Sequence, residues 1–429
     1  MKRLSLLILG LICLGVVPAI AADCPALVRQ ALAATDTLCH ETDKNQACYG
    51  NFNLKAQSIP SAENFSFSKP GDRVDISAIK SLQLSPMAMD TGEWGVALMK
   101  VQANVPAAPP SNLTLLAFGD VSLENDVPSP TTMDVNIVGP NAINARLMPN
   151  LNAGVVGSLK PNQILTAVDR LGDGSWLRVK LADSDQMGWV KSDYITTDGD
   201  LRTLNIVDGM QPHYSPMQAF TFKSGSETQN CAEVPQDGLL IQTPEGSGEV
   251  QLWINQVVVK LGSTVYFQAQ PSGDMVVSTV EGHATVEAMG VTYTAVAGSS
   301  IHIKLDADMK PVAPPSMPEA YELAAVANLP IDHLQRKITI HAPLTQQEVV
   351  NVQQSQSGNN GNSQNCPGNS CHNGTNNNNG NGGNNGNVGN GNNNGNSGNG
   401  SNNSGQNDDD KKKDKDKDKD KDKDKKNKP

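Results

Sequence analysis

The chain has 429 residues, enough for two or three domains, and a formal net charge of −11. Residues 408–429 contain 11 Lys and 9 Asp, so the rest of the chain carries −13. Because binding to phosphate backbones needs a basic face, this charge argues against nucleic acid as a partner. Hydrophobic residues make up 38% of the chain and are scarcest in the C-terminal tail, so the remainder can bury an ordinary core.

The N-terminus has the pattern of a secretory signal peptide. Residues 2–3 are basic, residues 4–17 are apolar, and residues 19–21 (AIA) fit the small-x-small cleavage rule. We expect residues 1–21 to be removed and the mature protein to be secreted or to reside in the cell envelope. An uncleaved anchor and a lipid anchor are the alternatives. No second long apolar run follows, so no transmembrane segment is expected in the mature chain.

Six cysteines remain after the signal peptide, and an even count in an exported chain predicts disulfides. The candidates are Cys24, Cys39, Cys48, Cys231, Cys366 and Cys371. Three of them lie close to the mature N-terminus, so at least one is expected to reach a distant partner, for which Cys231 is the candidate. The sequence leaves all three pairings of the first four open. Cys366 and Cys371 are close enough to pair with each other, and a metal site with His372 is the alternative.

The first mature segment, 22–52, reads as Cys-rich and helical. Helical spacing in "PALVRQALAATDTL" places Leu27, Ala31 and Leu38 on one face. Segment 53–130 changes to short strands broken by turns. "WGVALMKVQANV" and "LTLLAFGDVSL" alternate in part, which predicts a β-rich N-terminal domain.

Segment 134–197 has the most regular strand pattern. Five or six short strands, from "VNIV" to "GWV", are separated by turns every eight to twelve residues, which predicts a small all-β barrel. In "WLRVKL", Leu177 and Val179 fall on one face, and Trp176 and Arg178 on the other.

At these residues the chain resembles the bacterial SH3-like (SH3b) domain. The matching features are Asn-x-Arg-x-x-Pro at 144–149, Val-x-Gly-x-Leu at 155–159, Gly-x-Trp-x-x-Val at 174–179, Gly-Trp-Val at 188–190 and Tyr-Ile at 194–195. The family more often has Val before the Arg and a Ser-Gly pair after it, so "ARLMP" departs from the pattern in the first loop. The resemblance implies an SH3-like barrel and a peptidoglycan, glycan or peptide ligand.

The candidate ligand-binding residues of this barrel are Arg146, Trp176, Trp189 and Tyr194. The structural interpretation is that the rings fill a barrel that is short of apolar volume. The functional interpretation, implied by the resemblance, is a shallow aromatic surface that contacts a ligand. Both interpretations can hold for different faces of one ring.

Residues 198–236 read as a linker, and residues 237–306 return to short hairpins of a jelly-roll or meander-like β domain. This segment is similar to the periplasmic part of FecR-like regulators. The similarity rests on a Leu-Gly-Ser step at 261–263 and a Val-Glu-Gly turn at 280–282. The similarity implies a scaffold, and it does not imply a role in iron signalling.

The segment 307–356 is rich in Pro and short helices. Ser316 and Glu319, and again Thr345 and Glu348, have capping-box spacing. Residues 357–429, first rich in Asn and Gly and then alternating Lys and Asp, have almost nothing to bury and are expected to be disordered.

No catalytic constellation, metal site or cofactor motif is visible. The chain has no His-x-x-x-His pair, no Gly-x-Ser-x-Gly elbow and no phosphate loop. His283 follows Glu281 at a hairpin turn, where a solvated face is the expected role. The sequence therefore predicts a mainly β protein with several small β domains, in which the SH3-like barrel binds a cell-envelope ligand without catalysis. The alternative is an extracellular structural protein, or a FecR-like sensor or scaffold, with no ligand site in the barrel.

Overall fold

The computed structural model describes residues 24–103, 111–127, 131–182, 186–210, 212–225, 234–246 and 248–357. The predicted signal peptide and nearly all of the predicted disordered tail lie outside these residues. The described chain is mainly β, as predicted, and its strands form three sheets.

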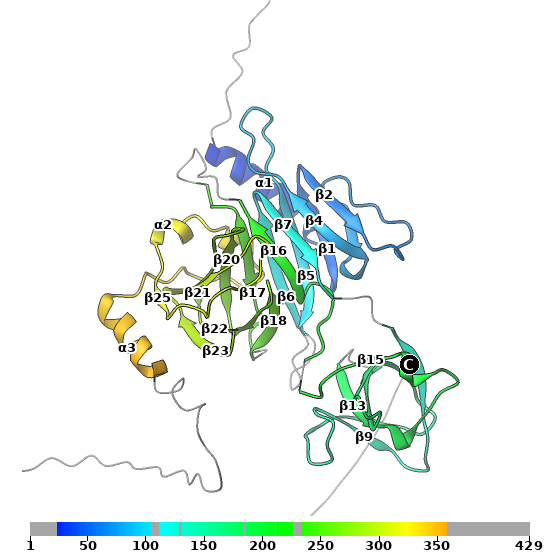
Figure 1. Cartoon of the computed structure of the whole chain (residues 1–429). Helices are drawn as coiled ribbons and strands as arrows, with labels where there is room; N and C mark the ends of the chain where they lie inside the picture. Colours follow the sequence, from blue (N-terminus) through cyan, green and yellow to red (C-terminus); the bar gives the residue numbers. More distant parts are fainter. Residues whose placement is uncertain are drawn as a thin grey trace, which may run out of the picture. The chain divides into compact units, whose positions relative to one another are not determined.

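Two of the sheets form a sandwich (Figure 1). The first sheet has, in spatial order, the strands β25 (Glu319–Ala320), β24 (Ser299–Lys304), β21 (Asp274–Glu281), β20 (Thr264–Ala269), β17 (Gly238–Gln242), β6 (Ser111–Phe118), β5 (Val96–Ala103), β1 (Gln46–Asn51) and β3 (Arg73–Asp75). The second has β2 (Leu54–Ser58), β4 (Ile79–Leu84), β7 (Val121–Asn125), β16 (Ala219–Ser224), β18 (Val250–Ile254), β19 (Val257–Leu261), β22 (His283–Ala288) and β23 (Val291–Val296).

The segments 53–130 and 237–306, which the sequence divides into two domains, share both sheets. In the first sheet β6 pairs with β17, with Leu116 opposite Leu240. In the second sheet β7 pairs with β16, with Leu123 opposite Phe222. A single cluster of buried side chains runs through both segments. They are therefore two halves of one sandwich, because neither half alone covers its inward apolar face.

The strand β16 falls inside the segment 198–236 that reads as a linker. Its sequence, AFTFKS, buries Phe220 and Phe222 completely and leaves Lys223 exposed. This alternation is a strand signal, but it is only six residues long. The strand lies between β7 and β18, so it joins the two halves of the second sheet.

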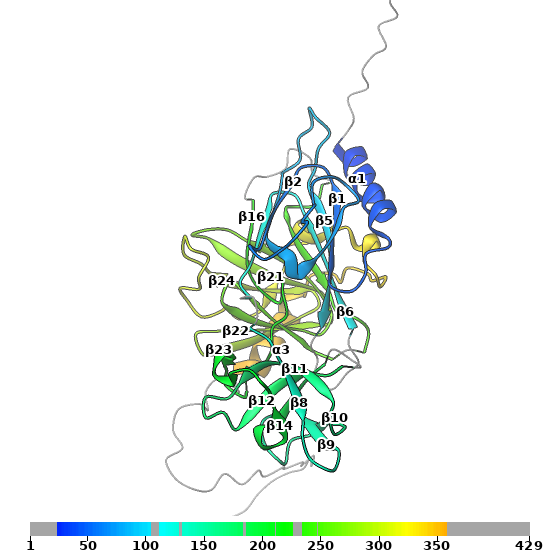
Figure 2. The ribbon, with the colours of Figure 1, turned by 90° about the vertical axis from the view of Figure 1, so that its right-hand side faces the viewer.

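The third sheet is the barrel, inserted in the chain between β7 and β16 (Figure 2). Its strands are β10 (Val155–Leu159), β9 (Ile143–Arg146), β13 (Met187–Lys191), β12 (Trp176–Lys180), β11 (Ile164–Arg170), β8 (Met133–Ile137) and β14 (Ile195–Thr196), and β15 (Asn205–Ile206) pairs with β11. Every strand predicted between 134 and 197 is present. Leu177 and Val179 point into the barrel core, as the alternation predicts.

Gly188 lies where β13 comes close to its neighbouring strands, and a short turn follows β13. A Cβ atom on Gly188 would lie 2.9 Å from Cβ of Ala145 and 3.0 Å from a methyl carbon of Val156, so only glycine lets these strands approach. The 3₁₀ turn η2 (Ser192–Tyr194) ends the strand and leads into β14.

Asn255 fixes the turn between β18 and β19. Asn255 and Gln256 both have positive φ, as this two-residue hairpin turn requires. The Asn255 side chain is buried, accepts a hydrogen bond from the Phe222 backbone N–H and donates one to the Phe222 carbonyl, both 2.8 Å long. The turn is thus tied directly to β16.

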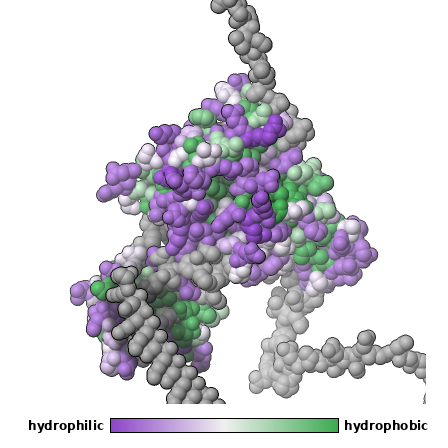
Figure 3. Space-filling model, turned by 180° about the vertical axis from the view of Figure 1, so that it is seen from behind, coloured by the Kyte–Doolittle hydropathy of each residue, from purple (hydrophilic) through white to green (hydrophobic). Residues whose placement is uncertain are grey.

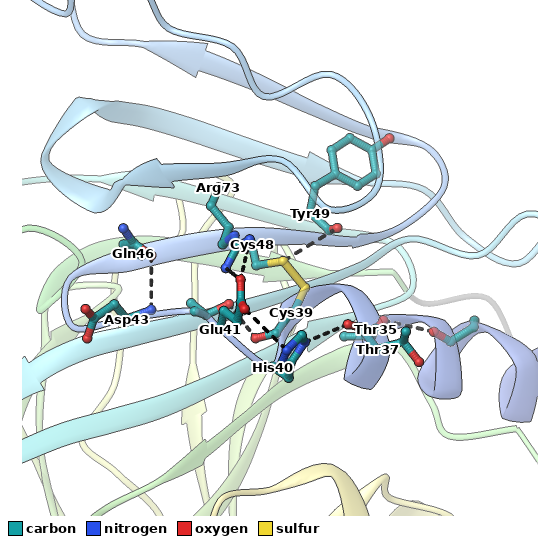
Figure 4. Close-up of a disulfide and its surroundings, with 12 residues drawn as sticks. Thr35, Thr37, Cys39, His40, Glu41, Asp43, Gln46, Cys48, Tyr49 and Arg73 are labelled. Carbon is teal, nitrogen blue, oxygen red and sulfur yellow. Dashed lines mark hydrogen bonds and ion pairs between the residues drawn. A yellow bond between two sulfur atoms is a disulfide. The ribbon is translucent and has the colours of Figure 1, made fainter.

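The helix α1 (Cys24–Cys39) begins the described chain and packs by Leu27 and Ala31 as predicted. Leu38, placed on the same face by the sequence pattern, is instead 37% exposed. The helix ends at Cys39, whose disulfide to Cys48 joins it to β1 (Figure 4). Both cysteines are buried, and Cys48 points away from the sandwich core, into which its neighbours Ala47 and Tyr49 point.

This disulfide resolves part of the pairing that the sequence left open. Cys24 is also disulfide-bonded. Cys231, its candidate distant partner, lies outside the described residues, as do Cys366 and Cys371.

The two predicted capping boxes have different outcomes. Thr345 and Glu348 form one at the start of α3 (Gln346–Ser357), where the Thr345 N–H donates to Glu348 over 2.8 Å. The spacing of Ser316 and Glu319 does not start a helix. Ser316 Oγ accepts from the His302 N–H over 2.9 Å, and Glu319 belongs to β25, so pairing with β24 prevails there. The later helix α2 (Leu323–Val326) is a single turn.

The face of the described residues that Figure 3 shows is predominantly polar. Hydrophilic side chains cover most of the face in Figure 3, and hydrophobic side chains are exposed there in small patches. Among the described residues, no helix is long and apolar enough to cross a membrane.

The role of Asn255 can be tested by the Asn255→Gly substitution. Glycine keeps the positive φ accessible but removes both side-chain hydrogen bonds to Phe222. We expect the free energy of unfolding to fall by about 2–3 kcal/mol, because a buried N–H and a buried carbonyl lose their partners. Chemical denaturation measures it. The matched control is Gln256→Gly at the neighbouring exposed turn position, and equal losses in the two variants would contradict the role of the side chain.

Candidate functional site

A row of directly opposed residues crosses the outer face of the barrel sheet. Val155 on β10 lies opposite Arg146 on β9, and Arg146 lies opposite Trp189 on β13. Trp189 in turn lies opposite Arg178 on β12, and Arg178 opposite Asp169 on β11. Directly opposed residues in antiparallel strands have side chains on the same face, so these five form one continuous row. We call it the barrel row.

The centre of the barrel row is a buried ion pair covered by an indole. Arg178 Nη1 lies 3.1 Å from Asp169 Oδ2, and both side chains are at least nine-tenths buried. The guanidinium carbon lies 4.6 Å from the centre of the Trp189 ring, a cation–π geometry. Burial lowers the pKa of Arg178 from its ordinary value, and the charge of Asp169 and its hydrogen bond oppose that shift. Because both groups are removed from water, each charge is stabilised mainly by the other.

The segment that follows the barrel closes over Asp169. The strand β15 runs parallel to β11, with Asn205 opposite Asp169. At Gly209 the backbone passes so near Pro149 that a Cβ atom would lie 2.3 Å from the proline ring. His213 then places Nδ1 3.2 Å from Asp169 Oδ2. Asp169 therefore has two basic partners, one from the barrel and one from the segment after it.

The four predicted ligand-binding residues differ in accessibility. Trp176 is 7% exposed and Trp189 is 3% exposed, so neither ring is an open surface, but neither belongs to the buried cluster that fills the barrel core. Arg146 is half-buried, and its Nη1 donates to the carbonyl of Ala153 over 2.8 Å. Tyr194 is 44% exposed on the turn η2 and is not part of the barrel row. The structure thus brings Arg146 and Trp189 together and places Tyr194 elsewhere.

Sequence reasoning did not single out Asp169, Arg178 or His213 as site residues. The alternation of "WLRVKL" places Arg178 on the outward face, but it does not tell which acid lies opposite. Asp169 is 44 residues from His213 along the chain, and only the return of the segment after the barrel brings them together.

A second candidate site is a cavity of about 460 Å³ in the sandwich. Its polar lining includes Glu245, Glu249, Ser263, Glu281, His283 and Arg336. These residues come from the β17–β18 loop, the β19–β20 turn, the β21–β22 turn and the C-terminal segment. Glu281 and His283, which are separated only by Gly282, are thereby joined by groups that are distant in the chain.

Paired charges line this cavity. Arg336 holds Glu281 through two parallel hydrogen bonds, each 2.6 Å long. His283 Nε2 lies 2.9 Å from Glu249, and Ser263 Oγ donates to Glu281 over 2.8 Å. The hydrogen bond of Arg336 is the largest cause that lowers the pKa of Glu281, and the same bond raises the pKa of Arg336.

The arrangement holds the C-terminal segment against the sandwich rather than assembling a nucleophile and base. The Ser263 hydroxyl donates to Glu281 instead of His283, so a serine–histidine pair is not formed. Gly262 lies directly under the imidazole, where a Cβ atom would be 2.5 Å from the ring. Among the described residues, no group of three His, Cys, Asp or Glu side chains could hold a metal ion.

The barrel row predicts a large cost for removing one charge. Arg178→Met leaves Asp169 buried without its guanidinium, and we expect the free energy of unfolding of the barrel to fall by about 3–5 kcal/mol. Fluorescence during urea unfolding of the full chain reports on this when Trp94 and Trp253 are replaced by Phe in every protein compared, so that only Trp176 and Trp189 contribute. In the control, Arg202→Met, the arginine is exposed and pairs with exposed Asp200, so no measurable change is expected. A loss no larger than that of the control would refute the assignment.

The Glu281–Arg336 pair predicts an acid-dependent stability. Because the folded-state pKa of Glu281 is below its ordinary value of 4.5, the carboxylate contributes stability above pH 4.5 that disappears as the pH falls through the folded-state value. Relative to Glu281→Gln, the wild-type advantage in unfolding free energy should be constant near neutral pH and shrink below pH 4.5. Denaturation midpoints of both proteins across this range measure it, and a difference that does not change with pH would contradict the linkage.

Comparison with known proteins assigns the barrel. No curated protein matches the chain. A family model described as the bacterial SH3 domain matches residues 141–196, which run from two residues before β9 to the end of β14. The described strands, the barrel core and this match agree, and the chain contains a bacterial SH3 domain.

Proposed function

We propose that this is an exported bacterial protein that binds, without catalysis, a cell-envelope ligand such as peptidoglycan or a peptide through its SH3 domain. The observation that carries the proposal is the bacterial SH3 domain itself, which is typical of envelope-binding or peptide-binding modules. The buried Cys39–Cys48 disulfide is consistent with a protein that folds outside the cytoplasm. The signal-peptide pattern of residues 1–21 supports export in the same way.

Exposed side chains in two parts of the barrel, the turn η2 and the β9–β10 hairpin, are the proposed contact residues. Trp176 and Trp189 are buried although they are not part of the barrel core, so they are not proposed as contact residues. Tyr194 presents an exposed ring, and Arg146 lies beside Val155, which is 54% exposed. Leu151, in the loop of the same β9–β10 hairpin, is 64% exposed. An exposed ring, apolar contacts and a cationic side chain are suited to a ligand with both apolar and anionic groups.

The proposal of a non-enzymatic role follows from how the titratable groups are engaged. Asp169 pairs with Arg178 and His213, and Glu281 pairs with Arg336. These contacts stabilise the fold and bring no nucleophile next to a base.

A second candidate is a scaffold or FecR-like sensor with no ligand site in the barrel. The burial of Trp176 and Trp189 favours it, because neither ring is available as an open aromatic surface. The closing of the segment around Gly209 against Pro149 favours it further. In this case residues 357–429 or the sandwich would carry the interaction.

Retention of the full-length chain on purified peptidoglycan tests the first candidate. We expect Tyr194→Ala and Arg146→Ala each to weaken retention by about ten-fold, the effect of removing a central contact residue. The control is Ile164→Ala, which removes another exposed apolar side chain of the barrel. Equal retention of all three variants would rule out this contact surface. Loss of binding only on deletion of residues 357–429 would favour the second candidate.

A further inference from the structure

The outer face of the second sheet carries an exposed aromatic pair. Trp253 on β18 is 39% exposed, because its neighbours Leu252 and Ile254 both point into the core. The ring of Tyr214 lies beside it, with ring centres 6.4 Å apart and planes 22° from parallel. Gln251 Nε2 donates to the Tyr214 hydroxyl over 2.8 Å, which fixes the phenol in place.

The position of Trp253 is unusual within the sandwich. Among the described residues, it is the one large hydrophobic side chain that is exposed inside a sandwich strand. The other tryptophans, Trp94, Trp176 and Trp189, are at most 7% exposed. A scattered exposed apolar residue needs no explanation, but an exposed indole with a second ring fixed beside it forms a platform.

Polar side chains extend this platform across the sheet. The strand register places two rows on the same face as Trp253: Val258, Glu287 and Thr292 continue from Trp253, and Lys260, Thr285 and Thr294 continue from Gln251. Neighbouring strands are about 4.8 Å apart, so each row is about 14 Å long. The hydroxyls of Thr285 and Thr294 are hydrogen-bonded to each other over 2.9 Å. We call these two rows and the aromatic pair the Trp253 face.

We propose that the Trp253 face binds a neutral oligosaccharide. A sugar ring has an apolar C–H face, which matches an exposed aromatic ring, and a rim of hydroxyls that both donate and accept hydrogen bonds. The Trp253 face offers the matching groups: the amide of Gln251, the ammonium of Lys260 and the carboxylate of Glu287. A few polar groups beside an apolar surface are what orients a ligand.

Two other kinds of partner fit this face less well. A peptide that adds as a strand needs a free sheet edge, and at β23 the Thr294 N–H and carbonyl are both hydrogen-bonded to the side chain of Gln356 on α3, over 2.8 and 2.7 Å. An anionic lipid surface needs an excess of basic residues, whereas Lys260 is balanced by Glu287. A neutral saccharide requires neither feature.

This inference is independent of ligand binding by the SH3 domain, because every residue that carries it lies on the sandwich or next to β16. The test uses the full-length chain with N-acetylchitotetraose and cellotetraose as probes. Of the four tryptophans, only Trp253 is accessible enough for efficient acrylamide quenching. We expect bound saccharide to protect the wild-type fluorescence from acrylamide, and we expect Trp253→Phe to remove the quenchable component.

Affinity is measured in parallel by calorimetry. We expect Trp253→Ala to weaken binding at least about ten-fold and Glu287→Gln and Lys260→Met to weaken it about three-fold or more. Met289→Ala, at an exposed turn residue outside the two rows, should leave binding unchanged. Glu287→Gln alters no buried group, so it keeps the test decisive if Trp253→Ala fails to fold.

The outcomes separate this inference from the proposed function. Tyr194→Ala should weaken peptidoglycan retention and leave saccharide binding intact. Failure of both saccharides to bind the folded wild-type chain would overturn the inference. Unchanged affinity in a folded Trp253→Ala protein, or protection by a short peptide and by neither saccharide, would overturn it as well.

Discussion

The pairing of β7 with β16 is the constraint on which the rest of the structure depends. The chain leaves the second sheet at Asn125 and returns at Ala219 and Phe220, and Phe220 lies directly opposite Asn125. The end of β7 and the start of β16 are therefore adjacent. A whole barrel can be inserted between them without separating these two strands. The same closure places β6 beside β17 in the first sheet, and both sheets bury one shared core.

Within the barrel, the buried pair of Asp169 and Arg178 has a comparable role. Two charges removed from water are stable only together, and the Trp189 ring shields them from solvent. That arrangement accounts for an indole that is buried although it lies on the outward face of the sheet. Because the centre of this face is buried, the side chains of the barrel that can contact a ligand are Tyr194 and those of the β9–β10 hairpin.

Several elements could be predicted because their information is local. The barrel strands, the Thr345 capping box and the β18–β19 hairpin depend on alternation, turn residues and spacing within about ten residues. Local patterns were misleading where a distant segment of the chain supplies the partner. Glu319 has helix-start spacing but pairs with β24, and Leu38 has core spacing but remains exposed. Tertiary contacts decide such cases because local preferences are worth only a fraction of a kcal/mol per residue.

By itself the sequence determined the mainly β class, the identity of the barrel and the residues that form its inner face. These follow from periodicity and from motifs that are contiguous in the chain. Only the tertiary structure decided that 53–130 and 237–306 are one sandwich, that Trp176 and Trp189 are buried and that Tyr214 stands beside Trp253. The reason is that alternation tells which side of a strand is apolar, whereas strand partners and the covering of an outer face depend on segments that are distant in the chain.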